Sequence, residues 1–115
     1  MSKYRNQKTF LDGFIFDSKK EAQRWAELKL LERSGQIINL ARQRKFELVP
    51  SVKGPRGGLH QRAVSYIADF EYFERKGNDW IRVVEDVKSE ATKTQVYQIK
   101  KKLMYWRYGI DIREV

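Results

Sequence analysis

The residues of this sequence that could do chemistry are carboxylates, and seven of them lie within 22 positions of its second half. They are Asp69, Glu71, Glu74, Asp79, Glu85, Asp86 and Glu90. The surrounding chain is basic, with 24 Lys and Arg against 15 Asp and Glu, a formal net charge of +9. Such a charge favours polyanionic partners such as nucleic acids. Acids clustered in a basic protein indicate a site where carboxylates hold a cation against a phosphate.

These acids belong to a predicted hairpin. Residues 63–74 and 80–88 are rich in aromatic and β-branched residues, which is typical of strands, and a turn sequence at 76–79 separates them. If the turn centres between Gly77 and Asn78, residues whose numbers add up to 155 lie opposite each other. The register of the whole hairpin then follows.

In that register, Asp69 and Asp86 are direct neighbours, with Cβ atoms about 4.5–5.5 Å apart. Strand alternation places Lys88 on the same face as Asp86, while Glu85 and Val87 point to the other face. Facing like charges destabilise a sheet unless something holds them together. A divalent cation with hard oxygen ligands, Mg²⁺ or Mn²⁺, would do so. The alternative is that both acids lie on a solvated face of an edge hairpin.

The elements before this hairpin are predicted as a small hairpin and a helix. Residues 9–16 contain an Asp-Gly turn between two apolar runs. The helix is predicted over 18–34, where Ser18 and Glu21 form a capping-box pattern. Glu21 lies on the same side of this helix as Trp25, which is expected in the core, so its carboxylate either caps the helix or points toward the sheet.

The remaining elements complete an α/β order. Residues 44–49 alternate as a strand, and residues 51–62 are a basic, Gly-rich segment predicted to be a flexible loop. A second helix is predicted over 94–108, followed by a short strand at 110–115. Its apolar face, expected to be buried, consists of Val96, Ile99, Leu103 and Trp106. We expect a single domain of order ββαβββαβ with a mixed sheet flanked by two helices.

Composition excludes several classes of function. The 115-residue chain has no cysteine, which removes disulfides, thiol catalysis, iron–sulfur clusters and thiolate zinc sites. A single histidine gives no support for a His-rich metal site. No apolar run approaches the ~18 residues of a membrane-spanning helix, so we expect no membrane association. Any catalysis must therefore use carboxylates, lysines and hydroxyl groups.

Four short segments resemble the PD-(D/E)XK nuclease superfamily. Residues 66–70 (YIADF) carry the first acid of its signature at Asp69, and residues 83–88 (VVEDVK) carry the (D/E)-x-K. Residues 18–22 resemble the first helix of that superfamily, whose glutamate often contributes to the metal site. Residues 94–110 resemble a small family of phage and prophage proteins usually described as endonucleases or Holliday junction resolvases. One departure is Ala68, where the signature has proline.

The resemblance implies a restriction-endonuclease-like core and phosphodiester hydrolysis. It implies that Asp69, Asp86 and the backbone carbonyl of Val87 bind Mg²⁺, for which Mn²⁺ can substitute, and that Lys88 orients the attacking water. Glu21 would add a ligand and allow a second metal. The protein would act in the cytoplasm of a bacterial host, and paired nicks on branched DNA such as a Holliday junction would require a twofold homodimer.

Basic and polar residues outside this site are candidates for DNA contact. They are Arg42, Arg44, Lys53, Arg56 and Arg62 around the Gly-rich segment, and Gln98, Lys100 and Lys101 on the second helix, where Lys102 and Arg107 extend the basic side. Two alternatives remain open. One is a non-catalytic nucleic-acid-binding module on a degenerate nuclease fold, and the other is a nuclease that acts on a different DNA structure.

Overall fold

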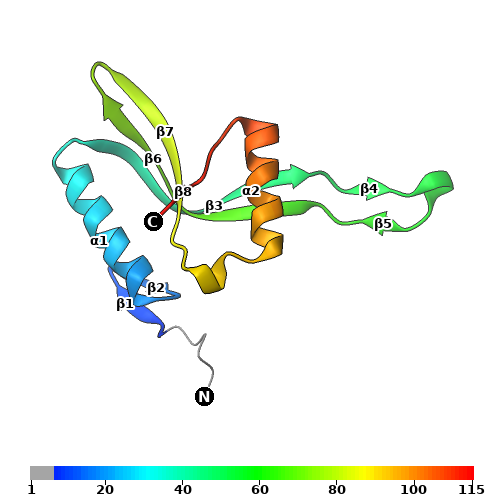
Figure 1. Ribbon diagram of the computed structural model, residues 1–115, viewed down its shortest axis with the longest axis horizontal. Helices are drawn as coiled ribbons and strands as arrows, with labels where there is room; N and C mark the ends of the chain where they lie inside the picture. The colour runs from blue at the N-terminus through cyan, green and yellow to red at the C-terminus, as the bar shows by residue number, and fades with distance from the viewer. Residues whose placement is uncertain (1–6) are drawn as a thin grey trace.

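The structure, a computed structural model, describes residues 7–115 and has a mixed four-stranded sheet with two helices (Figure 1). The strands follow the order β3-β6-β7-β8. Their bounds are Ile37–Val49, Val64–Lys76, Asp79–Asp86 and Arg113–Glu114. The first three strands are antiparallel, whereas β8 runs parallel to β7. The predicted α/β class and mixed sheet are confirmed.

The predicted N-terminal hairpin is confirmed as β1 (Thr9–Leu11) and β2 (Phe14–Phe16). Its turn residues Asp12 and Gly13 have φ values of 53° and 82°. Two consecutive positive φ angles fit the right-handed twist of a two-residue hairpin, which is why Asp-Gly is favoured there.

Helix α1 (Lys19–Arg33) confirms the prediction and begins at the predicted cap. The Oγ atom of Ser18 accepts a hydrogen bond from the backbone N–H of Glu21 at 3.1 Å. The capping box is altered in one respect, because the Glu21 carboxylate accepts from the N–H of Asp17 rather than that of Ser18. Trp25 is buried, as expected.

Strand β3 is seven residues longer than the predicted strand over 44–49, since it begins at Ile37. The extra part contains Asn39 and Gln43 with positive φ values of 57° and 55°. The pairing register with β6 also shifts between Ile38 and Ala41. Such irregular residues break the two-residue alternation that identifies a strand in a sequence.

Residues 50–63, which we call the arm, differ from the predicted flexible loop. They form a separate two-stranded ribbon that follows the last pair of the β3–β6 ladder, Val49↔Val64. Within the arm, β4 (Val52–Lys53) pairs with β5 (His60–Gln61), and a short 3₁₀ turn η1 (Pro55–Gly57) joins them. Figure 1 shows the arm projecting away from both helices along the long axis of the molecule.

The register of the β6–β7 hairpin confirms the prediction. The ladder runs from Lys76↔Asp79 to Phe70↔Glu85, and every pair adds up to 155. The turn therefore centres between Gly77 and Asn78, where Gly77 has a φ of 61°. One step beyond the last pair are the two aspartates.

Helix α2 (Gln95–Tyr108) follows a 3₁₀ turn, η2 (Glu90–Thr92), and has the predicted bounds, but its predicted buried face is wrong. Val96, Ile99 and Trp106 are 62%, 55% and 76% exposed. The helix instead buries Tyr97 and Met104 against the sheet. Trp106 is therefore not a core residue.

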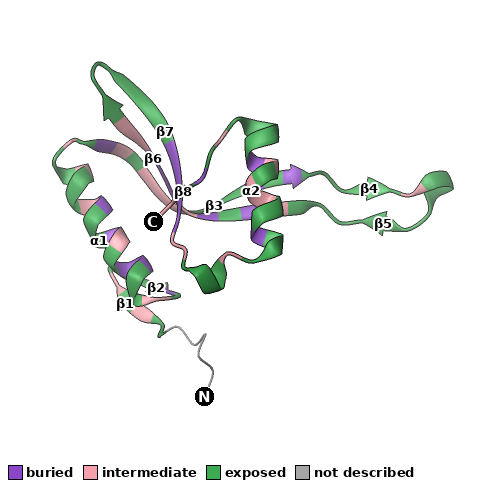
Figure 2. Cartoon of the chain, in the orientation of Figure 1, coloured by how far each residue is buried: buried purple, intermediate pink, exposed green. Residues whose placement is uncertain are grey.

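The core consists of two groups of buried side chains, one beside each helix. The α1 group contains Phe16, Ala22, Trp25, Leu28, Ile37, Phe70, Tyr72 and Val83, and the α2 group contains Phe46, Leu48, Tyr66, Ala68, Val84, Tyr97, Met104 and Ile112. Strands β3, β6 and β7 each contribute to both groups, so the sheet joins them (Figure 2). Among residues 7–115, no helix is long and apolar enough to cross a membrane.

Candidate active site

Asp69 and Asp86 lie side by side at the inner end of the β6–β7 ladder, as the register predicted. The backbone N–H of Val87 donates a hydrogen bond to Oδ2 of Asp69 at 2.8 Å, which fixes this carboxylate across the strand pair. The Nζ atom of Lys88 lies 3.3 Å from Oδ2 of Asp86. The predicted placement of Lys88 on the same face as Asp86 is therefore confirmed.

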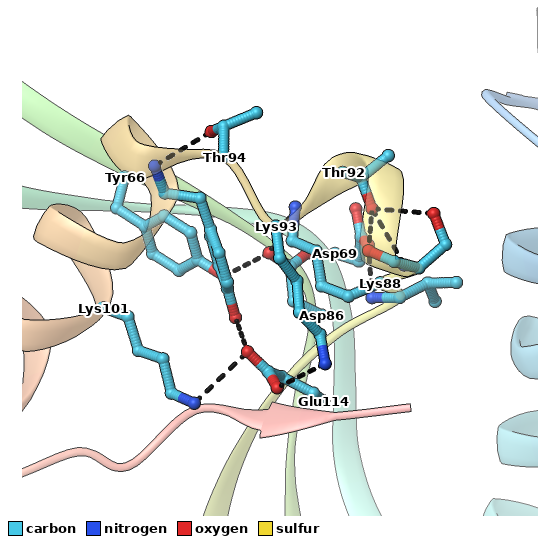
Figure 3. A network of polar contacts seen from close by, with 12 residues as sticks. Tyr66, Asp69, Asp86, Lys88, Thr92, Lys93, Thr94, Lys101 and Glu114 are labelled. Atoms are coloured by element: carbon cyan, nitrogen blue, oxygen red, sulfur yellow. Dashed lines mark hydrogen bonds and ion pairs between the residues drawn. The ribbon is translucent and has the colours of Figure 1, made fainter. Parts of the chain in front are cut away.

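The Asp86 carboxylate is 3% exposed and is held by two groups. The hydroxyl of Tyr66 donates to Oδ2 of Asp86 at 2.6 Å, and Lys88 makes the ion pair just described (Figure 3). Burial and this hydrogen bond raise the pKa of Tyr66, so its hydroxyl remains a donor. Lys88 also lies over the ring of Tyr97, with Nζ 4.3 Å from the centroid. Neither tyrosine was identified from the sequence.

The environment of Asp69 strongly disfavours its negative charge. Its pKa is raised from 3.8 to about 8, first by burial and then by the hydrogen bond and negative charge of Asp86. The hydrogen bond from the N–H of Val87 acts in the opposite direction and is the smaller effect. Without a cation the pair therefore retains a proton near neutral pH, and a bound cation would favour its full ionisation.

Glu21 reaches this acid pair from α1. Its side chain is 4% exposed, and one oxygen accepts from the N–H of Asp17 while the other accepts from Nε2 of Gln43 at 3.3 Å. Burial raises the pKa of Glu21, and its side chain lines the same cavity as Asp69. The two roles weighed for Glu21 therefore coexist, because the same side chain supports the helix start and lies at the acid pair.

These side chains line a cavity of about 510 Å³ between the start of α1, the centre of β6 and the start of α2. The predicted site residues in its wall are Glu21, Asp69, Asp86, Val87, Lys88 and Lys100. Its other polar walls include Gln43, Tyr66 and Tyr97. Gln43 lies opposite Asp69, since β3 and β6 pair as Arg42↔Phe70 and Arg44↔Ala68. Gln43 lies just before the predicted strand over 44–49, so it was not identified from the sequence. A strand predicted over the full length of β3 would have placed it opposite Asp69.

A second network surrounds Glu85, on the opposite side of β7 as predicted. Glu85 is fully buried, and its carboxylate accepts hydrogen bonds from Nε and Nη2 of Arg24 at 2.8 and 2.6 Å. The hydroxyl of Tyr72 donates to the same carboxylate. Because its charge is paired, Glu85 ties α1 to the sheet and takes no part in the cavity.

Glu114 of β8 anchors the start of α2 below the cavity. It accepts a hydrogen bond from the hydroxyl of Tyr97 at 2.7 Å and ion-pairs with Lys93 and Lys101 at 3.4 and 3.2 Å (Figure 3). The hydrogen bond from Tyr97 lowers the pKa of Glu114. This network fixes the ring of Tyr97, which in turn lies against Lys88.

The structure separates the predicted DNA-contact residues into two sets. Several cations are engaged within the chain: Lys101 with Glu114, Arg44 with Glu71 at 2.9 Å, and Arg107 with the backbone oxygen of Leu48 at 3.0 Å. The guanidinium of Arg42 lies 4.5 and 4.7 Å from the rings of Phe14 and Phe16. The set left on exposed surface is Lys53, Arg56 and Arg62 on the arm and Gln98 and Lys102 on α2.

Metal ligation at this site rests on two aspartates rather than on a larger cluster. Within residues 7–115, no group of three or more His, Cys, Asp or Glu side chains is arranged to hold a metal ion. Mg²⁺ retains several waters and is usually bound through one or two carboxylates. Asp69 and Asp86 supply hard oxygen donors, and Val87, whose carbonyl the resemblance implies as a further ligand, lines the same cavity, so the donor set fits Mg²⁺ or Mn²⁺.

Comparison with known proteins gives one match. The family described as "Protein of unknown function (DUF1064)" matches residues 1–114. The chain belongs to the DUF1064 family. No curated protein and no solved structure matches it. The description of the DUF1064 family assigns no activity, so a function has to be argued from the site itself.

Proposed function

We propose that this DUF1064 protein is a metal-dependent DNA endonuclease with a restriction-endonuclease-like core, as its resemblance to the PD-(D/E)XK superfamily implies. The observation that carries the proposal is the β6–β7 register, which brings Asp69 and Asp86 together with Lys88 on the face of Asp86. Asp69, Asp86 and Lys88 then line one cavity that is open to a ligand. Such a donor set can support metal-dependent phosphodiester hydrolysis without a histidine or a thiol.

The metal in this proposal is Mg²⁺, with Mn²⁺ able to replace it. Asp69, Asp86 and the Val87 carbonyl would hold it, and Glu21 would hold a second ion. A divalent ion bound there supplies charge stabilisation for the phosphate and lowers the pKa of a coordinated water. The raised pKa of Asp69 supports this assignment, because two adjacent carboxylates without a cation retain a proton.

Lys88 is the residue proposed to orient the attacking water and to neutralise charge at the scissile phosphate. Its ammonium group is held between Asp86 and the ring of Tyr97. Such a group costs little further ordering when the substrate binds. Lys100, in the wall of the same cavity, would contact a neighbouring phosphate.

The substrate class in this proposal is DNA, with branched DNA such as a Holliday junction first. The chain has one such cavity in the region described, so paired nicks on a junction would require a twofold homodimer. Its place of action would be the cytoplasm of a bacterial host cell, as for the phage and prophage proteins that the sequence resembles.

One observation favours a second candidate, a non-catalytic DNA-binding module. Oδ2 of Asp69 and Oδ2 of Asp86 accept hydrogen bonds from Val87 and Tyr66, and residues 7–115 contain no three-carboxylate metal group. A degenerate site could persist in this form as a structural support. Metal dependence separates the two candidates, because a binding module keeps its full activity in EDTA.

The test is incubation of the protein with labelled four-way junction, duplex and single-stranded DNA, each with Mg²⁺, Mn²⁺ or EDTA. We expect cleavage with either metal and none in EDTA, with the junction cut fastest. The Asp69→Asn variant serves as the control for contaminating nuclease. Binding without cleavage under every metal condition would refute the nuclease and support the binding module.

A further inference from the structure

The arm is exposed to solvent along almost its whole length. Every residue from 50 to 63 is exposed except Gly54, which is intermediate, and none belongs to either buried group. Even its apolar side chains are open, with Val52 50% and Leu59 84% exposed (Figure 2). An isolated two-stranded ribbon is only marginally stable in water. A ribbon held out from the body is therefore poised to lie against another molecule.

The charge of the arm identifies the kind of molecule. It carries Lys53, Arg56 and Arg62, and the chain has no Asp or Glu between Glu47 and Asp69. None of these three cations makes an ion pair or a side-chain hydrogen bond within the described chain, whereas Arg44, at the base of the arm, is paired with Glu71. A surface of one sign without internal partners is complementary to a polyanion.

The shape of the arm selects duplex DNA among polyanions. With about seven residues on each side at ~3.3 Å per residue, the ribbon extends about 20 Å. The major groove of B-DNA is ~12 Å wide and admits a two-stranded β-ribbon, whereas the major groove of duplex RNA is too narrow. At the tip, the chain turns at Arg56 and Gly57, whose φ values are 58° and 73°. A short, tight turn of this kind suits a close approach to DNA.

The arm and the candidate active site are adjacent along the chain. The arm ends at Ala63, β6 begins at Val64, and the next residues, Ser65, Tyr66 and Ile67, already line the cavity that contains Asp69. Only two residues on each side, 50–51 and 62–63, link the strands of the arm to β3 and β6, so the arm projects from the strand that carries Asp69. A duplex held by the arm would extend away from a phosphate bound in the cavity.

We propose that the arm is a DNA-binding β-ribbon that lies in the major groove of the duplex flanking the cavity, with Lys53, Arg56 and Arg62 on its phosphates. This inference rests on the proposed function for the position of the bond that is cut, but its claim about binding does not depend on cleavage. It adds about three phosphate contacts at a distance from the acid pair. It also implies that the substrate has several base pairs of intact duplex on the arm side.

The test compares three proteins by their binding to a 24-base-pair duplex in EDTA over a range of salt concentrations. The first is the parent. The second is the Lys53→Ala/Arg56→Ala/Arg62→Ala variant. The third, the Lys8→Ala/Arg33→Ala/Lys76→Ala variant, loses the same charge from exposed positions outside the arm. All six residues are exposed, so both variants should fold.

For the parent, about five neutralised phosphates give a slope of log K against log[salt] near −4 to −5. The arm variant should reduce the steepness by about 2.7 and weaken binding at least tenfold at ~0.1 M salt, while the control changes the slope by less than about 1. Equal slopes for the arm variant and the control would overturn the proposal. If the arm variant weakened binding to duplex RNA as much as binding to duplex DNA, the placement of the arm in the major groove would be overturned.

A second variant removes the arm itself. Replacing residues 50–63 by Asn-Gly joins Val49 to Val64, the last pair of the β3–β6 ladder, through a two-residue turn. It should show the same reduced slope as the triple variant, and retention of the parental slope would contradict the proposal. If the parent cuts no DNA, the nuclease proposal fails and the binding result still stands. If the arm variants bind normally, the arm proposal fails and any cleavage remains explained.

Discussion

The inner end of the β6–β7 hairpin and the arm that precedes β6 are built for opposite purposes. From Tyr66 to Tyr72 strand β6 is central in the sheet, with Ala68 and Phe70 fully buried and Asp69 fixed between them. Before Val64, where β6 begins, the chain forms the arm, which is exposed and basic. A site that binds a cation needs carboxylates held rigidly and away from water. A surface that meets DNA needs reach and free charge.

The difference shows that burial and charge are divided between two neighbouring segments of the chain. The inner end of the β6–β7 hairpin has strongly shifted ionisation and many internal hydrogen bonds, whereas the cations of the arm have no partner within the described chain. Changes at the inner end of the hairpin should therefore alter chemistry and stability. Changes in the arm should alter affinity alone.

The largest effect is expected from Asp86→Asn at the inner end of the β6–β7 hairpin. The change preserves shape but removes a charge from the proposed metal site, so cleavage should fall by about 10³-fold or more. Without metal, relief of the repulsion with Asp69 opposes the loss of the ion pair with Lys88, so the free energy of unfolding should change less than in Arg24→Ala. DNA binding in EDTA should persist. Asp79→Asn, at the exposed end of the same strand, is the control. If folded Asp86→Asn cleaved DNA at the rate of the parent, the nuclease proposal would be refuted.

Arg24→Ala should produce the largest loss of stability. It leaves the fully buried carboxylate of Glu85 without its cation, and removing one partner of a buried pair costs about 3 kcal/mol or more. Denaturant unfolding measures the change. Arg33→Ala, on the exposed end of the same helix, should stay within about 0.5 kcal/mol. Similar losses of stability for the two variants would show that the Glu85 network does not stabilise the inner end of the β6–β7 hairpin.

The acid pair predicts how stability depends on pH in the absence of metal. The pKa of Asp69 is about 8 in the folded protein and near 3.8 when unfolded, so the folded state binds the extra proton between these values. Stability should therefore fall as the pH rises from about 4 to about 8, by about 2 kcal/mol after allowance for partial solvent access.

Melting curves in EDTA at pH 5 and pH 8 measure this difference. Asp69→Asn should lack the part of the pH dependence that belongs to this group, and Mg²⁺ should reduce it in the parent because the cation opposes the cost of ionisation. An identical pH dependence for the parent and Asp69→Asn would show that the pair does not retain a proton.

Glu21→Gln separates support of the helix from a role at the acid pair. Glutamine keeps an oxygen that can accept from the N–H of Asp17, so the melting temperature should change little. The rate of cleavage should fall at least tenfold, about 1.4 kcal/mol, because a negative ligand is lost. Glu27→Gln, on the exposed side of the same helix, provides the comparison. If Glu21→Gln cleaved DNA at the rate of the parent, the role of Glu21 would be purely structural.

The smallest effect on stability is expected at the arm. Because the arm buries no side chain in either core group, replacing residues 50–63 by Asn-Gly should change the free energy of unfolding by less than about 1 kcal/mol. Chemical denaturation tests this, with the parent as reference. A loss of several kcal/mol would mean that the arm is part of the folded core. It would remove the contrast between the arm and the inner end of the β6–β7 hairpin.

Local patterns were sufficient for most of the elements and for the acid pair. The Asp12-Gly13 turn, the Ser18 cap and the Gly77-Asn78 turn each act over a few residues, so their consequences can be worked out from the sequence. The turn fixes the hairpin register, and the register alone brings Asp69 to Asp86. This is why the centre of the site was predictable.

Contacts between distant segments were not predictable in this way. Gln43 reaches the site because β3 extends through two residues with positive φ. Tyr66 reaches Asp86 across two neighbouring strands, with its ring beside Tyr97 of α2. The exposed face of α2 is the clearest case. Its apolar spacing predicted burial, but the sheet it packs on takes up Tyr97 and Met104 instead.

The sequence by itself determined the turns, the caps, the β6–β7 register and the excess of positive charge, because each depends on neighbouring residues or on composition. Only the tertiary structure decided which cations remain free. Arg44, Lys101 and Arg107 found partners within the fold, whereas Lys53 and Arg62 are held beyond its reach on the arm. The physical reason is that an ion pair requires two groups within about 4 Å, a distance that the packing of the chain sets.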